Sequence, residues 1–169
     1  MSVSMYQATI PVFIRGLRVV SALLEKAQAH VEEDGIVPEI LLGAQLAPDM
    51  LDLTVQVQRV SDTSKMSVER LSGVPAPKFE DNEASFEQLQ ERIASTIAYI
   101  DSVNAGQMAG SAQKEVVLNW TDEGKKFSGD HYLLSFALPN FYFHVSMVHA
   151  ILRNNGVAVG KLDYLGPYD

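Results

Sequence analysis

The spacing of apolar residues predicts a long first helix over residues 6–31. Apolar side chains recur there at steps of three and four residues, which places them on one face of an α-helix. Gly35 follows as the residue expected to end this helix, and Pro11 lies near its start, where it marks a bend or a late start. A short apolar piece over 38–46 then predicts one or two helical turns. The predicted inward face of the first helix consists of Phe13, Leu17, Val20, Leu24, Ala27 and Val31.

The same periodicity predicts two further helices. One begins near Pro48, since proline suits a first helical position, and ends before the Gly73–Pro77 break. The other begins at Ser85, which together with Gln88 matches a capping box. The inward positions are Met50, Leu53, Val57, Val60, Ser64, Val68 and Leu71 in the first of these, and Phe86, Leu89, Ile93, Ile97, Ile100 and Val103 in the second.

The chain from residue 115 onward changes its pattern twice. Residues 115–128 alternate loosely around a turn and predict a small β-hairpin, with Trp120 and Phe127 as its expected anchors. A fourth helix is then predicted from Asp130, a good N-cap, to Asn154, with a bend at Pro139. The remaining tail has too much glycine and proline for a further helix.

Four apolar stripes must bury one another, and a bundle is the simplest arrangement that does so. The sequence therefore predicts an all-α fold, a four-helix bundle with the hairpin inserted between the third and fourth helices. We expect residues 1–169 to form a single domain of this kind.

Composition narrows the classes of function. The chain has a net charge of −8 and no cysteine, which excludes disulfides and thiolate chemistry. Its basic residues are scattered, so we expect no nucleic-acid partner. We find neither a signal peptide nor an apolar stretch of the length needed to cross a bilayer, and we therefore expect a cytoplasmic protein without a membrane partner.

Two polar residues of the fourth helix point toward its apolar side. At about 100° per residue, Asn140 and His144 lie within about 40° of each other and beside Val148 and Ile151. A buried imidazole and a buried amide need hydrogen-bond partners. Asn140 and His144 therefore either line an internal site or form an ordinary core contact, and the second alternative is the commoner one.

Polar residues of the second helix form the other candidate group. Asp49, Asp52, Gln56 and Thr63 share a face, with Arg59 beside them. This face is either solvated or it places Gln56 or Asp52 opposite His144 across the bundle. Among the other histidines, we expect His149 to face solvent or a subunit contact, and neither His30 nor His131 is a strong ligand candidate.

Several stretches resemble a bacterial and fungal family of unknown function within the DinB/YfiT-like superfamily. They are residues 46–58, 138–145, 150–157 and 160–166, and the resemblance covers nearly the whole chain. It implies an up-down-down-up bundle with a long connection between the second and third helices, commonly as a homodimer. Better-known members bind a divalent metal through one histidine of the second helix and a His-x-x-x-His pair of the fourth, and some are thiol-dependent transferases or isomerases.

This chain departs from that metal pattern. Its second helix has no histidine, and His144 has Asn140 four residues before it and Val148 four residues after it. Neutral amides bind transition metals weakly. We therefore predict no cofactor and a lost metal site, and we disfavour the alternative in which zinc or nickel binds.

Three functional hypotheses remain at this point. The first is an uncharacterised homodimeric protein that binds a small molecule at a reduced internal site of His144, Asn140, Gln56, Asp52 and Asp49. The second is an enzyme of the thiol-transferase or hydrolase kind, with His144 as a general base or as a single metal ligand. The third is a structural or interaction protein without an active site. Apolar Val12, Val19 and Leu23 beside the main stripe of the first helix add to the expectation of a dimer.

Overall fold

The computed structural model describes residues 3–119 and 124–167 and begins with the longest helix of the chain. Helix α1 (Met5–Asp34) is capped by Ser4, whose Oγ accepts the Gln7 amide at 3.2 Å while Gln7 Oε1 accepts the Ser4 amide at 3.0 Å. It ends at Gly35, whose φ of 64° is readily available to glycine. Pro11 lies inside α1, so the alternative of a late start is wrong, and the helix begins one residue before the predicted start at Tyr6.

The second long helix begins later than the sequence suggested. After the single turn of α2 (Pro38–Leu42), helix α3 spans Leu53–Ser72. Its N-cap is Asp52, whose Oδ1 accepts the Val55 amide at 2.9 Å. The prediction of a start near Pro48 is therefore wrong, because the capping carboxylate four residues later is what fixes the first turn.

Helix α4 spans Phe86–Asp101, and its predicted start is confirmed. Ser85 Oγ accepts the Gln88 amide at 3.2 Å. The Gln88 side chain reaches back to the Ala84 amide at 2.6 Å, one residue before the position that a capping box requires.

The predicted hairpin is present in the described part of the chain. After one 3-10 turn (η1, Ser111–Gln113), strand β1 (Glu115–Leu118) pairs antiparallel with β2 (Lys125–Ser128). Phe127 packs against the helical core, with its ring centroid 6.3 Å from that of Tyr132. Trp120, the other predicted anchor, lies outside the described residues.

The fourth long helix is not uniform. It consists of α5 (Gly129–Tyr132), a π-helical turn labelled η2 (Leu133–Ala137) and α6 (Leu138–Asn154). Ser128, not Asp130, occupies the N-cap position, and Asp130 lies in the first turn. In the widened turn the Leu138 amide donates to the Leu133 carbonyl, five residues back, just before the proline that lacks a donor of its own.

The expectation of a tail without a helix is wrong. Helix α7 (Lys161–Leu165) forms there and lies along α1. Asp163 accepts the Gly160 amide at 2.7 Å and the Lys26 ammonium at 2.6 Å. Tyr164 and Ser146 share a hydrogen bond of 3.0 Å. These tertiary contacts stabilise the short helix α7, which the amino-acid composition of the tail does not favour.

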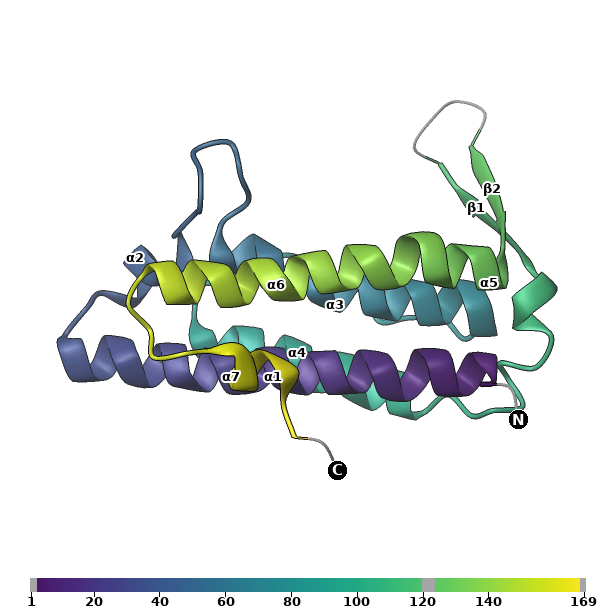
Figure 1. Cartoon of the computed structure of the whole chain (residues 1–169), viewed down its shortest axis with the longest axis horizontal. Helices are drawn as coiled ribbons and strands as arrows, with labels where there is room; N and C mark the ends of the chain where they lie inside the picture. The colour runs from purple at the N-terminus through teal and green to yellow at the C-terminus, as the bar shows by residue number, and fades with distance from the viewer. Residues whose placement is uncertain (1–2, 120–123, 168–169) are drawn as a thin grey trace.

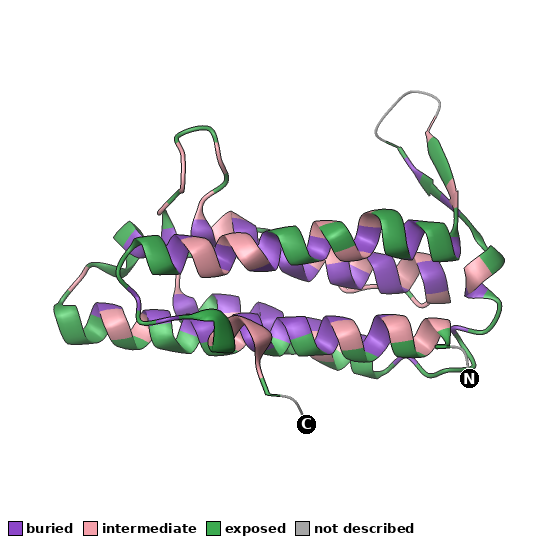
Figure 2. Cartoon of the chain, viewed as in Figure 1, coloured by how far each residue is buried: buried purple, intermediate pink, exposed green. Residues whose placement is uncertain are grey.

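The long helices lie side by side, with α3 packed most extensively on α6 and α1 on α4 (Figure 1). Hydrogen bonds join Ser21 to Gln90 and Gln28 to Glu87, so residue numbers rise along α1 as they fall along α4. Buried positions face the interior between the helices, and exposed positions cover the outer surfaces (Figure 2). The fold is thus mostly helical, with one small antiparallel sheet.

Helix α1 has two properties that bear on partners. Contrary to the expectation from sequence, it is long and apolar enough to cross a membrane by length and composition, although more than half of its most apolar window is buried within the fold, as in a core helix. Val19 and Leu23, which suggested a dimer contact, are covered within the chain itself. Dimerisation stays a prediction, without support from these two residues.

Candidate functional site

The seam between α3 and α6 brings together two of the residues singled out from the sequence. His144 Nδ1 lies 2.8 Å from Gln56 Oε1, and the two residues are 9% and 1% exposed. The Gln56 Nε2 group donates to the Leu51 carbonyl at 3.3 Å, which leaves its oxygen to accept. His144 therefore carries its proton on Nδ1 and keeps a lone pair on Nε2.

This environment favours a neutral imidazole. Burial lowers the pKa of His144 below its ordinary value, and the positive charge of Arg59 lowers it further. A neutral histidine with Nδ1 protonated can accept a hydrogen bond at Nε2, or act there as a base.

A second pair lies further along the same seam. Asn140 Nδ2 donates to Thr63 Oγ1 at 2.9 Å. Thr63 then keeps its hydroxyl proton, and Asn140 keeps its carbonyl oxygen without a partner among the residues that the structure describes. The seam therefore offers both a donor and an acceptor for a further molecule.

Thr63 and Asn140 border a hollow of about 170 Å³, whereas Gln56 and His144 are not among its lining residues. This volume is close to that of an engineered cavity of about 150 Å³ that binds benzene. Leu118 at the end of β1 contributes to the rim, so the hairpin forms part of the hollow. The side chains around it come from α3, β1, α5, η2 and α6: Arg59, Asp62, Thr63, Met66, Arg70, Leu118, Tyr132, Phe136 and Asn140.

One wall of the hollow is a chain of hydrogen bonds centred on Tyr132, which is 0% exposed. Arg70 Nη1 can only donate, and it lies 3.0 Å from the Tyr132 hydroxyl. Ser67 Oγ donates to the Thr63 carbonyl at 2.6 Å, so Tyr132 donates to Ser67 over 2.9 Å. Each proton is thereby assigned, and the Arg70 guanidinium is held beside the hollow.

The two predicted carboxylates do not join this site. Asp52 is the N-cap of α3, and its carboxylate serves the Val55 amide. Asp49 is exposed in the turn before α3, so it does not lie on the helical face assigned to it. Of the alternatives for a residue opposite His144, the structure therefore places Gln56 there and not Asp52.

The other histidines make local contacts. His149 is half-buried, and its Nε2 lies 3.0 Å from the Gly160 carbonyl in an exposed contact, so the ring binds its own chain while part of it meets solvent; the alternative of a subunit contact stays a prediction. His30 Nδ1 lies 3.3 Å from Asp34, and His131 Nδ1 lies 3.1 Å from the Ser135 hydroxyl. None of these rings takes part in the seam.

The seam residues fit a transition metal poorly. They supply one imidazole nitrogen and two amide groups, and the better amide oxygen, that of Gln56, already accepts from His144. Amides are weak ligands for zinc and nickel. Within residues 3–119 and 124–167, His, Cys, Asp and Glu form no group of three that could hold a metal ion.

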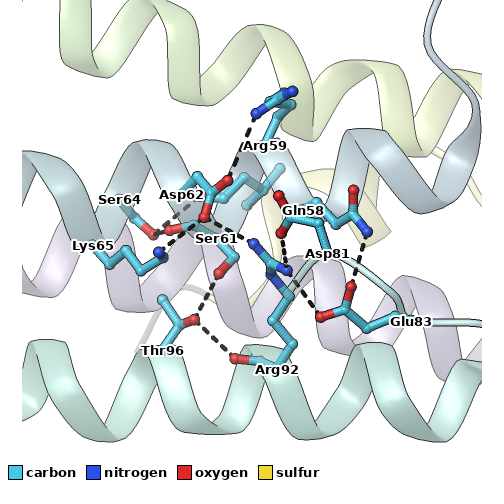
Figure 3. A network of polar contacts seen from close by, with 11 residues as sticks. Gln58, Arg59, Ser61, Asp62, Ser64, Lys65, Asp81, Glu83, Arg92 and Thr96 are labelled. Atoms are coloured by element: carbon cyan, nitrogen blue, oxygen red, sulfur yellow. Dashed lines mark hydrogen bonds and ion pairs between the residues drawn. The ribbon is translucent and has the colours of Figure 1, made fainter. Parts of the chain in front are cut away.

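A second polar cluster lies on the other side of α3, against α4 (Figure 3). The guanidinium of Arg92 is only 1% exposed and contacts Asp62 at 2.8 Å, Asp81 at 2.6 Å and Glu83 at 2.9 Å. Burial disfavours its charge, yet these carboxylates raise the pKa of Arg92 overall. Burial likewise opposes ionisation of Glu83, but hydrogen bonds from Arg92 and Gln58 hold its pKa below the ordinary value.

This Arg92 cluster holds the connection between α3 and α4 on the bundle. Asp81 and Glu83 both belong to that connection, and the Phe79 ring lies 4.6 Å from the Arg92 guanidinium carbon. Tyr99 adds a hydrogen bond of 2.6 Å to the Val74 carbonyl, and burial beside Glu69 raises its pKa to about 12. We assign the cluster a structural role.

Sequence reasoning missed Arg70 and Tyr132 as site residues. Tyr132 lies in the first turn of a helix whose register then changes at the π turn, so counting at 100° per residue from His144 gives the wrong face. Arg70 lies two turns beyond Thr63 on α3. Its spacing from Thr63, seven residues, was the available signal.

Comparisons with known proteins agree with this architecture. Residues 5–165 match the family described as "Domain of unknown function (DUF1993)". A crystal structure of a DinB family member protein from Shewanella denitrificans is 37% identical, covers 98% of this chain and 94% of its own, and superposes with a TM-score of 0.91. No functionally curated protein matches the chain. The chain therefore belongs to the DUF1993 family and has the DinB-like fold.

Proposed function

We propose that this protein binds a small anionic molecule in the hollow between α3 and α6. The observation that carries the proposal is unused hydrogen-bonding capacity around a preformed space. Arg59 and Arg70 supply positive charge, Thr63 a hydroxyl proton and Asn140 a carbonyl oxygen at one hollow of about 170 Å³. Few polar groups converging on a small concave surface are typical of ligand sites.

Charge favours an anion over a cation in this hollow. Two guanidinium groups border it, against the single carboxylate of Asp62. That carboxylate already contacts Lys65 at 3.0 Å and Arg92 at 2.8 Å. Arg59 lies 3.7 Å from Asp62, a long and half-exposed pair that leaves its guanidinium able to bind a ligand.

His144 lies at the end of the seam and contributes in a second way. It is not one of the residues that line the hollow, so its orienting role acts through the neighbouring Arg59, which does line it, and the Gln56 hydrogen bond fixes the ring. The proposal also includes an up-down-down-up order of the four long helices and a homodimeric protein. A cytoplasmic location is a further part of this proposal.

The enzyme alternative rests on the Nε2 lone pair of His144. A thiol-transferase or hydrolase would use His144 as a general base, or as the single protein imidazole on a metal. The amide donors around it make the metal version the weaker one. Metal analysis of protein purified without a histidine tag tests the metal version. Zinc or nickel at about one ion per chain would favour the enzyme alternative over simple binding.

The test of binding titrates the ¹⁵N-labelled full chain with benzoate or inorganic phosphate and detects binding by NMR. We expect saturable shifts of the Asn140 side-chain amide and the Thr63 backbone amide with at least one probe. Arg59→Gln should weaken that binding about tenfold, as expected when a charged hydrogen bond is lost. Arg18→Gln, which removes the same charge on α1, is the matched control and should leave it unchanged.

Two results would contradict the proposal. One is the absence of saturable shifts at Asn140 and Thr63 with either probe. The other is equal weakening by Arg59→Gln and Arg18→Gln, which would indicate general attraction to positive charge and not a site.

A further inference from the structure

A second hollow lies against α1, apart from the α3–α6 seam. It has a volume of about 570 Å³, in the range of sites for drug-sized ligands. α1 forms its floor, and α7 with the residues after it forms one wall. Its principal lining residues are Ile10, Ile14, Arg15, Arg18, Val19 and Pro167.

The wall of this hollow is held in place by specific contacts. Arg15 Nη2 donates to the carbonyls of Leu165 at 2.5 Å and Pro167 at 3.1 Å. Lys26 holds Asp163 at 2.6 Å. A Cβ on Gly166, where φ is 67°, would lie 3.0 Å from Val19 Cγ2, so the tail approaches the floor closely. The hollow is therefore a built feature and not an accident of a loose terminus.

The floor is apolar and ends at a cation. Ile10, Ile14 and Arg18 follow one another at four-residue steps, so they form a row along α1. At 1.5 Å per residue this row is about 12 Å long, which suits a medium-length alkyl chain with its polar end at Arg18. Ile10 and Ile14 line the hollow together with Val19 and Pro167, and such an apolar lining favours an apolar ligand body.

Arg18 is the free charge of the hollow. Arg15 is engaged by two carbonyls and Asp163 by Lys26, whereas Arg18 has no hydrogen-bond or ion-pair partner within residues 3–119 and 124–167. Asp101 at the end of α4 also lines the hollow and makes the surroundings less favourable for a dianion. A single carboxylate is the group that a lone guanidinium binds best, through two parallel hydrogen bonds.

We propose that this hollow is a second site, which binds an elongated apolar monocarboxylate with its chain over Ile10 and Ile14 and its carboxylate on Arg18. The site is independent of the α3–α6 seam, because the two share no residue. It depends on α7, the element that the sequence did not predict.

The experiment titrates the full chain, stripped of bound lipid, with decanoate below its micelle-forming concentration, using calorimetry. Decylamine and decanol are the head-group controls. We expect saturable binding of one decanoate per chain, with both controls weaker. Arg18→Gln should weaken decanoate about tenfold, while Arg59→Gln, in the other hollow, should change it less than twofold. Circular dichroism melting of each variant confirms that it folds.

A second variant separates the site from a surface between two copies. Ala22→Trp places a large ring at the end of the hollow and should abolish decanoate binding while the sedimentation behaviour stays that of the parent. The proposal is overturned if decanoate fails to saturate, if decylamine binds as well as decanoate, or if Arg18→Gln has no effect. It is also overturned if Ala22→Trp dissociates a dimer of the free chain, because the hollow would then be covered by a second copy.

Discussion

Helix α3 carries two polar regions that differ in how completely their hydrogen bonds are used. Toward α4, the buried Arg92 guanidinium meets three carboxylates that are partly exposed to solvent. Toward α6, Asn140 and Thr63 satisfy each other with one bond and keep further capacity beside an open hollow. Arg92 Nε also lacks a hydrogen-bond partner among the described residues, but this atom is buried. Unused hydrogen-bonding capacity therefore indicates a site only where it borders an open hollow, as at Asn140 and Thr63.

The charges of the two regions lead to the same distinction. Around Arg92, the three carboxylates of Asp62, Asp81 and Glu83 face the cations of Arg92 and Lys65, with Arg59 as a third, more distant cation at Asp62, so the cluster needs no external ion. Around the α3–α6 hollow, the guanidinium groups of Arg59 and Arg70 outnumber the one carboxylate, which is shared with the other side. The first region holds the fold together, and the second can recognise a ligand.

The largest expected effect comes from Arg92→Met. This change leaves three carboxylates facing one another without their guanidinium, and we expect the free energy of unfolding to fall by about 3–5 kcal/mol. Urea unfolding followed by circular dichroism measures it. Arg59→Gln, which removes a half-exposed arginine from the same Asp62, should cost less than about 1 kcal/mol. Similar losses for both variants would mean that the Arg92 cluster is not the structural element we describe.

The two regions also differ in how far they could be predicted. The long helices follow from apolar spacing, and the inward position of His144 follows from the same count, because both depend on local periodicity. Placing Gln56 opposite His144 was one of two alternatives, since the register between two helices is a property of packing. The start of α3 was misplaced because Asp52 competes with Pro48 as a start signal.

Features that depend on distant contacts were not predictable in this way. α7 forms because its residues Asp163 and Tyr164 make hydrogen bonds to Lys26 of α1 and Ser146 of α6. The three acids around Arg92 come from α3 and from the connection after it, so no local spacing relates them. Tyr132 was not predicted as a site residue because the π turn shifts the helix register between Tyr132 and His144.

The next effect in size concerns the Gln56–His144 pair. Gln56→Leu removes the acceptor and leaves the His144 Nδ1 proton buried, so we expect a loss of about 1–3 kcal/mol in the free energy of unfolding. Replacing both residues, as Gln56→Leu with His144→Leu, should recover part of that loss because the buried imidazole proton is removed together with its acceptor, although the Leu51 carbonyl still loses the Gln56 donor. Urea unfolding of the single and double variants forms a complete cycle. Strictly additive losses would show that the two residues do not interact.

A smaller loss is expected for Tyr132→Phe. The variant keeps the ring, which packs in the core, and removes only the hydroxyl between Arg70 and Ser67. Because Arg70 borders an open hollow, water can replace one partner, and we expect a loss of about 1 kcal/mol by thermal or urea unfolding. We also expect weaker binding of the anionic probe, since Arg70 is no longer held. Unchanged binding with unchanged stability would remove Tyr132 from the site wall.

The smallest effect is a pH dependence just below pH 6.5, which comes from His144 in the α3–α6 seam; the lowered pKa of Glu83 in the Arg92 cluster acts at more acid pH. The pKa of His144 is lowered in the folded protein, first by burial and then by Arg59, so the unfolded chain binds more protons between that lowered value and the ordinary 6.5. The free energy of unfolding should therefore rise with pH across this window and become level above it.

Urea unfolding at a series of pH values below and above 6.5 measures this slope, and the difference between the parent chain and His144→Gln isolates the contribution of His144. Arg59→Gln should make the slope shallower, because it removes the repulsion but leaves the burial. If the parent and His144→Gln had parallel pH profiles, His144 would titrate alike in both states. The buried, neutral imidazole on which the orienting role rests would then be wrong, while the Arg92 cluster would be unaffected.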